Sequence, residues 1–166
     1  FYDDWWEDAS KEFRYSYIDI FPNISNTITA HDVQVNSITA WDQSVVRRGV
    51  PYELGKFNVD FKKSGEYKIT LRRWPKESKL NLRDSINDYI PARKYWDQQA
   101  SGKSMNIASA FIKIGDKQYN IDLSNNLKSA TININIDSGK TSLEPAFILD
   151  NGQTSVVFYT DIEFLF

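Results

Sequence analysis

Few side chains in this sequence could carry out catalysis, and the first to consider is the single histidine, His31, because Asp32 follows it directly. A histidine next to an aspartate could belong to a nucleophilic triad or to a metal site. Either site needs further partners, and the sequence has no second histidine, no cysteine and no Gly-x-Ser-x-Gly turn. Carboxylate pairs such as Asp3 with Asp4 lie in polar surroundings typical of solvated surface. We therefore predict no catalytic residue and no metal site in this chain, with His31 as a structural or interface residue.

The most unusual local sequence is Arg72-Arg73-Trp74, which ends an alternating run. The period of two places Arg73 on the apolar side of the expected strand, where a charge is costly unless it is paired and hydrogen-bonded. We therefore expect Arg73 to have a carboxylate or carbonyl partner, with Glu77 and Asp42 as candidates. Two interpretations of Trp74 stay open. We favour packing over an edge of the fold, and the alternative is a sugar platform on which Arg72 pairs with a sulfate or carboxylate group.

Four more side chains are candidates for ligand or interface contacts: Trp41, Arg47, Arg48 and Trp96. For Trp41 we favour a place in the core, and for the two arginines we favour interface charges, with ligand contacts second. Trp96 lies in a stretch without regular periodicity, where it could join Trp74 in holding a glycan.

A mainly β fold must position these candidates. Tyr2, Trp5, Trp6 and Phe13 keep one helical face, so we predict that residues 1–14 form a short linking helix. Residues 15–166 contain about nine alternating runs separated by turn signals. We predict that they form a single domain, an antiparallel two-sheet β-sandwich.

Two hairpins and one isolated strand carry most of that prediction. The first hairpin joins residues 57–61 to 67–71 across the polar segment 62–65, and the second joins 108–114 to 119–123 across Gly115. Alternation over 132–137 predicts a strand with one dry face and one wet face. The remaining exception is residues 76–106, a long loop of mixed charge, which we expect to bind something, cap an edge or be disordered.

Composition limits the protein classes that this chain can belong to. Its 166 residues fit one domain, and hydrophobic residues make up 41% and aromatic residues 14%, enough for a large core. A net charge of -2 with scattered basic residues argues against nucleic acid as a partner, and no apolar run is long enough for a membrane span. A start as rich in aromatic residues as Phe1-Tyr2-Asp3-Asp4-Trp5-Trp6 leads us to interpret the chain as a fragment of a larger protein. Any export signal would then lie upstream of Phe1.

The sequence resembles the C-terminal accessory domain of bacterial arylsulfatase-like enzymes. The resemblance rests on four segments in order, and the last of them is a specific thirteen-residue motif. The segments are Tyr2-Asp3-Asp4-Trp5-Trp6; His31-Asp32; Trp41 with Arg47-Arg48-Gly49; and Gly65-Glu66-Tyr67-Lys68-Ile69-Thr70-Leu71-Arg72-Arg73-Trp74-Pro75-Lys76-Glu77. Later strands near residues 110–115 and 152–159 are also similar. One departure is Val33, where the family often has tryptophan.

The resemblance implies a periplasmic or secreted parent enzyme that cleaves sulfate esters of carbohydrates. Its catalytic domain would lie upstream, where a Cys/Ser-x-Pro-x-Arg signature supplies a formylglycine beside a calcium ion. This chain lacks that signature, because no cysteine or serine stands two residues before any of its five prolines. We therefore expect no cofactor in this chain and a non-catalytic role, with the upstream catalytic domain as its partner.

Two other functions stay open at this stage. In the first, the chain is an independent carbohydrate-binding module that holds a sulfated glycan through Trp74, Trp96 and their arginines. In the second, it is a structural protein-interaction domain, which requires an uncovered apolar patch that includes Trp5 and Trp6.

Overall fold

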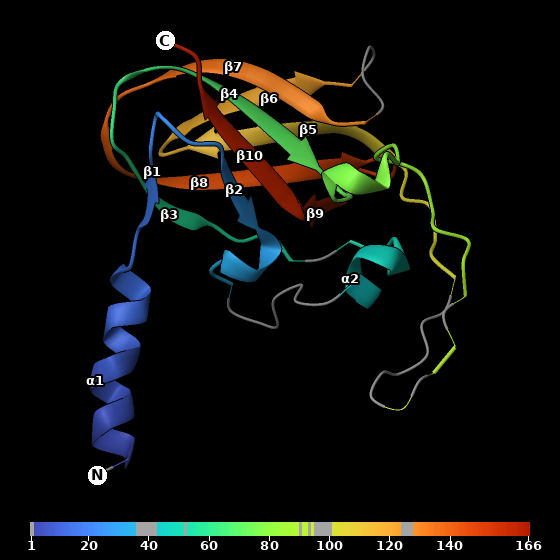
Figure 1. The fold of residues 1–166 in the computed structure, drawn as a ribbon, viewed down its shortest axis with the longest axis horizontal. Helices are drawn as coiled ribbons and strands as arrows, with labels where there is room; N and C mark the ends of the chain where they lie inside the picture. Colours follow the sequence, from blue (N-terminus) through green and yellow to red (C-terminus); the bar gives the residue numbers. More distant parts are fainter. Residues whose placement is uncertain are drawn as a thin grey trace.

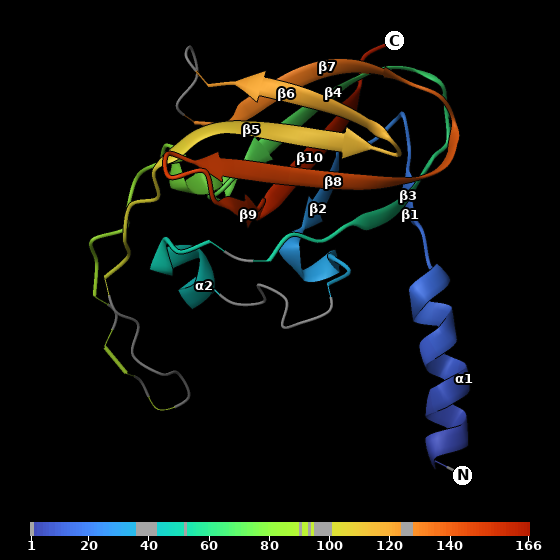
Figure 2. The same cartoon turned by 180° about the vertical axis from the view of Figure 1, so that it is seen from behind.

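The computed structural model describes residues 2–35, 43–51, 53–89, 91, 92, 94, 101–123 and 128–166. Within these residues the chain is mainly β, with two sheets and a short N-terminal helix (Figures 1 and 2). The helical elements are α1 (Tyr2–Tyr15), η1 (Ala30–Asp32), α2 (Gln43–Arg48) and η2 (Lys76–Ser78). The strands are β1 (Ile18–Ile20), β2 (Asn26–Thr29), β3 (Phe57–Phe61), β4 (Gly65–Arg72), β5 (Ile107–Ile114), β6 (Lys117–Asp122), β7 (Ala130–Ile136), β8 (Gly139–Leu149), β9 (Thr154–Val156) and β10 (Tyr159–Phe164).

The first sheet is mixed, which corrects the prediction of two antiparallel sheets. Its strand order is β1-β3-β8-β5-β6, with β9 paired to β8, and β1 runs parallel to β3. The second sheet, β2-β10-β4-β7, is antiparallel throughout. Parallel neighbours need a long crossover. Here the chain leaves β1, forms β2 in the second sheet and returns to the first sheet only at β3, a route that local alternation does not reveal.

One hydrophobic cluster is built from both sheets. Alternation places the apolar side chains of each strand on the face that looks toward the other sheet. Strand β3 shows the pattern clearly, because Phe57, Val59 and Phe61 are buried while Asn58 and Asp60 are partly exposed. Strand β4 supplies Tyr67, Ile69 and Leu71, each with no exposed surface.

The predicted hairpin between residues 57–61 and 67–71 is wrong in its pairing, although both strands exist. Strand β3 pairs with β1 and β8, whereas β4 pairs with β10 and β7, so the segment between them crosses from one sheet to the other. The rings of Phe61 and Tyr67 meet edge to face across the core, 5.0 Å apart. An alternating pattern fixes which face of a strand is buried and leaves its neighbour unspecified.

The second half of the chain follows the predictions more closely. Strands β5 and β6 form the expected hairpin, with Gly115 at a φ of 55° in the turn. Strand β7 buries Ile134 and Ile136 and exposes Asn133 and Asn135, so its dry and wet faces are confirmed.

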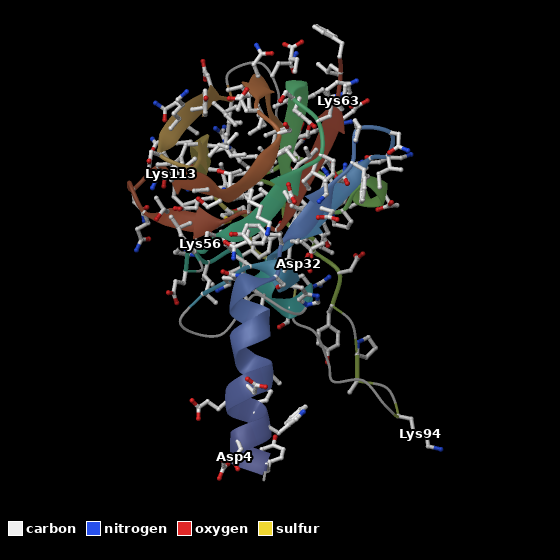
Figure 3. The ribbon with its side chains drawn as sticks, turned by 90° about the vertical axis from the view of Figure 1, so that its left-hand side faces the viewer. Asp4, Asp32, Lys56, Lys63, Lys94 and Lys113 are labelled. Carbon is white, nitrogen blue, oxygen red and sulfur yellow. The ribbon has the colours of Figure 1, made fainter. Side chains whose placement is uncertain are left out.

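Helix α1 extends away from the sheets (Figures 1 and 3). It begins and ends within one residue of the predicted linking helix. Tyr2, Trp5 and Trp6 are 70%, 57% and 51% exposed. Among the described residues, no helix is long and apolar enough to cross a membrane.

The stretch 76–106 is a long connection, as predicted. Its described residues contain the short helix η2 and neither an α-helix nor a strand. Lys94, labelled in Figure 3, lies far from the sheets. The described part of this loop projects in the same direction as α1 but from the opposite end of the body (Figure 1).

Candidate functional site

Arg72 joins two strands of the second sheet through a nearly buried ion pair. Its Nε and Nη2 donate to the two carboxylate oxygens of Asp161 on β10, at 2.7 and 2.9 Å. Its Nη1 donates to the backbone oxygen of Trp74 at 2.8 Å, and its guanidinium lies 5.1 Å from the ring centre of Tyr159. Both ends of a planar guanidinium are therefore used, which is the arrangement that makes arginine specific for carboxylates.

Side chains on β2 and η2 also contact the carboxylate of Asp161. It also accepts a hydrogen bond of 2.7 Å from Thr27 Oγ1, and Lys76 Nζ lies 3.5 Å from it. Burial alone would raise the pKa of the Asp161 carboxyl, but the hydrogen bonds from Arg72 and Thr27 and the charges of Arg72 and Lys76 lower that pKa below its ordinary value. Asp161 is therefore held as a carboxylate within the sheet.

Arg73 is fully buried, with 0% of its surface exposed, and its partners are backbone carbonyls. Its Nη1 donates to Asp84 O at 2.9 Å, and its Nη2 donates to Val46 O at 2.9 Å and to Lys103 O at 2.7 Å. The expected carbonyl partner is confirmed. Asp42, one of the two residues proposed for this role, lies outside the described residues, and the three acceptors belong to neither it nor Glu77.

These three bonds connect three separate segments. Val46 lies on α2, whereas Asp84 and Lys103 lie on opposite arms of the 76–106 loop. Burial lowers the pKa of Arg73 to about 10, and the nearby charge of Asp84 opposes that shift. The guanidinium therefore stays charged at neutral pH and ties α2 and both loop arms to the end of β4.

Trp74 does not present a platform to solvent. Only 5% of its surface is exposed, and the guanidinium of Arg73 stacks 4.4 Å from its ring centre. Its indole Nε1, like Arg73 Nε, is buried without a hydrogen-bond partner. The packing interpretation of Trp74 therefore fits the structure, because its ring and the two arginines beside it are at most 9% exposed.

Arg47 binds both arms of the loop, one through its side chain and the other through its backbone. It is 5% exposed, its Nη2 donates to Asp88 O, and its own backbone oxygen accepts from Lys103 N at 2.7 Å. Gly102 N also donates to Ile86 O at 2.6 Å. We call residues 86–88 and 101–103 the loop neck. Arg47 and Arg73 together clamp this neck to α2 and β4.

Gly49, which follows α2, is required for this packing. Its φ is +62°, and a Cβ built on it would lie 2.6 Å from Ser104 O and 2.7 Å from Lys103 O. Only glycine tolerates both the left-handed backbone and the close approach of the loop. The basic pair and the glycine in Arg47-Arg48-Gly49 thus serve the clamp through Arg47 and Gly49.

The other predicted site residues do not join the clamp. Arg48 is exposed, and its Nη2 lies 3.3 Å from Ser44 Oγ. His31 is exposed on η1, and the neighbouring Asp32 carboxylate accepts hydrogen bonds of 3.0 Å from the backbone and hydroxyl of Thr29. Trp41 and Trp96 lie outside the described residues. Within the described part of the chain, no group of three or more His, Cys, Asp or Glu side chains could hold a metal ion.

The arrangement holds distant segments of the chain together, because buried arginines donate hydrogen bonds to backbone carbonyls and to a carboxylate from those segments. Sequence reasoning missed Asp161, whose partnership with Arg72 joins residues 89 positions apart. The comparisons with known proteins add no identity, because no protein-family model matches the sequence and no curated protein shows significant similarity to it.

Proposed function

We propose that this chain is the non-catalytic C-terminal accessory domain of a periplasmic or secreted sulfatase that acts on sulfated carbohydrates. In this proposal its two sheets form a β-sandwich that stabilises the upstream catalytic domain and walls one side of its substrate pocket. The calcium ion and the formylglycine of the parent enzyme belong to that catalytic domain. The support comes from motifs that resemble the family in their order, and from the buried contacts that the arginines of those motifs make in the fold.

The observation that carries this proposal is the shared direction of α1 and the loop. Both project in the same direction from the body, as Asp4 on α1 and Lys94 on the loop show in Figure 3, although they leave it at opposite ends in Figure 1. The clamp formed by Arg47 and Arg73 fixes the loop neck at its own end of the body. A neighbouring domain on the side to which both project would meet a loop with an anchored base and a helix with exposed aromatic rings.

The buried motif arginines also weigh against an independent glycan-binding module. Arg72, Arg73 and Trp74 are three of the residues that such a module would use, and all three are at most 9% exposed. The fourth, Trp96, lies outside the described residues. A structural protein-interaction domain shares the exposed helix α1 with our proposal, and the two functions differ only in the partner.

The test begins with the coding sequence upstream of Phe1. We expect a Cys/Ser-x-Pro-x-Arg signature there. We also expect the whole parent protein to hydrolyse a chromogenic sulfate ester, a truncated parent without this domain to lose thermal stability, and the 166-residue chain alone to show no turnover. An upstream segment without the signature, or turnover by the isolated chain above background, would contradict the proposal. Titration of the isolated chain with sulfated oligosaccharides, followed by tryptophan fluorescence, tests the binding-module alternative in parallel.

A further inference from the structure

The first two turns of α1 carry a continuous group of exposed rings, which we call the aromatic face: Tyr2, Trp5 and Trp6. The ring centres of Tyr2 and Trp5 are 5.9 Å apart, and those of Trp5 and Trp6 are 6.1 Å apart. Each ring has at least half of its surface exposed. Single exposed rings are common on protein surfaces, whereas adjacent ones at the end of a projecting helix form a patch typical of interaction sites.

Over residues 2–8, helix α1 also lacks the packing that usually keeps such a helix folded, because each of these residues is exposed. It is 14 residues long, and isolated helices shorter than about 12–15 residues are marginal in water because tertiary packing supplies most of their stability. In Figures 1 and 2 the helix stands clear of both sheets along its described length. A partner that covers the aromatic face would supply the missing stabilisation.

The charges around this face define the partner. Asp3, Asp4, Glu7 and Asp8 are all exposed, and no lysine or arginine lies among residues 2–8. Asp3 and Asp4 lie in the first turn, where their charges also complement the helix dipole. Acidic side chains that border an aromatic face complement a surface with an apolar centre and a cationic rim.

We propose that the aromatic face of α1 docks into an apolar groove, rimmed by lysine and arginine side chains, on the catalytic domain of the parent enzyme. This inference rests on the proposed function and names the contact through which the two domains hold each other. The aromatic rings supply the buried centre of the contact, and the four carboxylates set its orientation.

Hydrogen exchange of the α1 backbone amides tests this contact in the whole parent protein and in the 166-residue chain. In the parent we expect these amides to exchange at least about 10-fold more slowly than in the shorter chain, because docking suppresses local unfolding. The double variant Trp5→Ala/Trp6→Ala should return the parent to the fast rates. Raising the ionic strength from about 0.1 M to about 1 M, which shortens the Debye length from about 10 Å to about 3 Å, should weaken the protection.

A charge-matched pair of variants separates docking from general electrostatics. Glu7→Lys/Asp8→Lys should lose protection of α1, whereas Asp116→Lys/Asp137→Lys, which makes the same charge change at exposed turns of the sheets, should retain it. Equal effects of the two double variants would overturn the cationic-rim assignment.

The remaining outcomes distinguish this inference from the proposed function. A parent with the sulfatase signature but fast-exchanging α1 amides overturns the docking contact alone. Protected amides beside an upstream domain without the signature support the docking contact and reject the sulfatase assignment. Light scattering that shows a dimer of the 166-residue chain, lost in Trp5→Ala/Trp6→Ala, would identify a second copy as the occupant and overturn the inference.

Discussion

Replacing Arg73 with methionine removes the three bonds that join α2 and both loop arms to β4. The acceptors are Val46 O, Asp84 O and Lys103 O, at 2.7–2.9 Å. Hydrogen bonds from a charged donor contribute about 1.5–3 kcal/mol each. The stacking on Trp74 adds about 1–2 kcal/mol. Removing a buried charge also relieves a desolvation cost of several kcal/mol, so we expect a net destabilisation of about 3 kcal/mol.

Urea unfolding followed by circular dichroism measures this change in the free energy of unfolding. For a domain of this size, 3 kcal/mol corresponds to a fall in Tm of roughly 6–12 °C. Arg73→Lys should cost at least as much as Arg73→Met, because one ammonium keeps the buried charge but lacks the planar fork that reaches three carbonyls. Hydrogen exchange should quicken at Gly102 and Lys103 in both variants. Arg48→Met is the matched control, and it should change stability by less than about 0.5 kcal/mol since Arg48 is exposed.

Unfolding of Arg73→Lys at the same urea concentration as the wild type would refute this role of the Arg73 hydrogen bonds. This role is also refuted if the loop-neck amides keep their protection in the methionine variant. Either result would mean that the carbonyl bonds do not fix the neck.

Asp161→Asn should destabilise the protein by about 3 kcal/mol at neutral pH, because Arg72 loses its buried carboxylate partner. Because folding lowers the pKa of Asp161, the carboxylate stabilises the fold fully above its unfolded pKa of about 4, and this stabilisation is lost as the pH falls through the folded pKa. The difference in unfolding free energy between wild type and variant should therefore shrink below about pH 4. Urea unfolding across a pH series checks this, and a gap that stays constant down to about pH 2 would contradict it. Gly49→Ala should cost more than about 2 kcal/mol, since the new methyl group would collide with Ser104 O as well as strain the backbone. Gly152→Ala is its control, because Gly152 has a φ of +81° with open space around it, and thermal melts that show equal losses for the two variants would argue against the collision.

Local patterns in the sequence predicted the parts of the fold that depend on neighbours in the chain. Helix α1 follows from its apolar spacing, and the hairpin of β5 and β6 follows from two alternating runs around Gly115. The pairing of β3 failed because its partners, β1 and β8, are set by the route of the whole chain.

The candidate site, like the fold, could be predicted from the sequence only in part. The period of two showed that Arg73 needs a buried partner, and general rules of charge burial showed that a carbonyl would serve. Which carbonyls serve depends on α2 and on a loop without periodicity, so the sequence could not name Val46 or Lys103. The partnership of Arg72 with Asp161 was hidden for the same reason, because an aspartate in an alternating strand looks like an ordinary solvated residue.

The parallel pairing of β1 with β3 determines how a mechanical load would pass through this domain. Ile18, Asp19 and Ile20 lie beside Val59, Asp60 and Phe61, and the chain runs from α1 directly into this edge strand (Figure 1). Tension drawn along α1 therefore acts along the strand axis and shears the β1–β3 hydrogen bonds together, whereas a strand pulled from its side would peel away one bond at a time. A body attached to α1 would then transmit its force to the domain through the whole sheet edge.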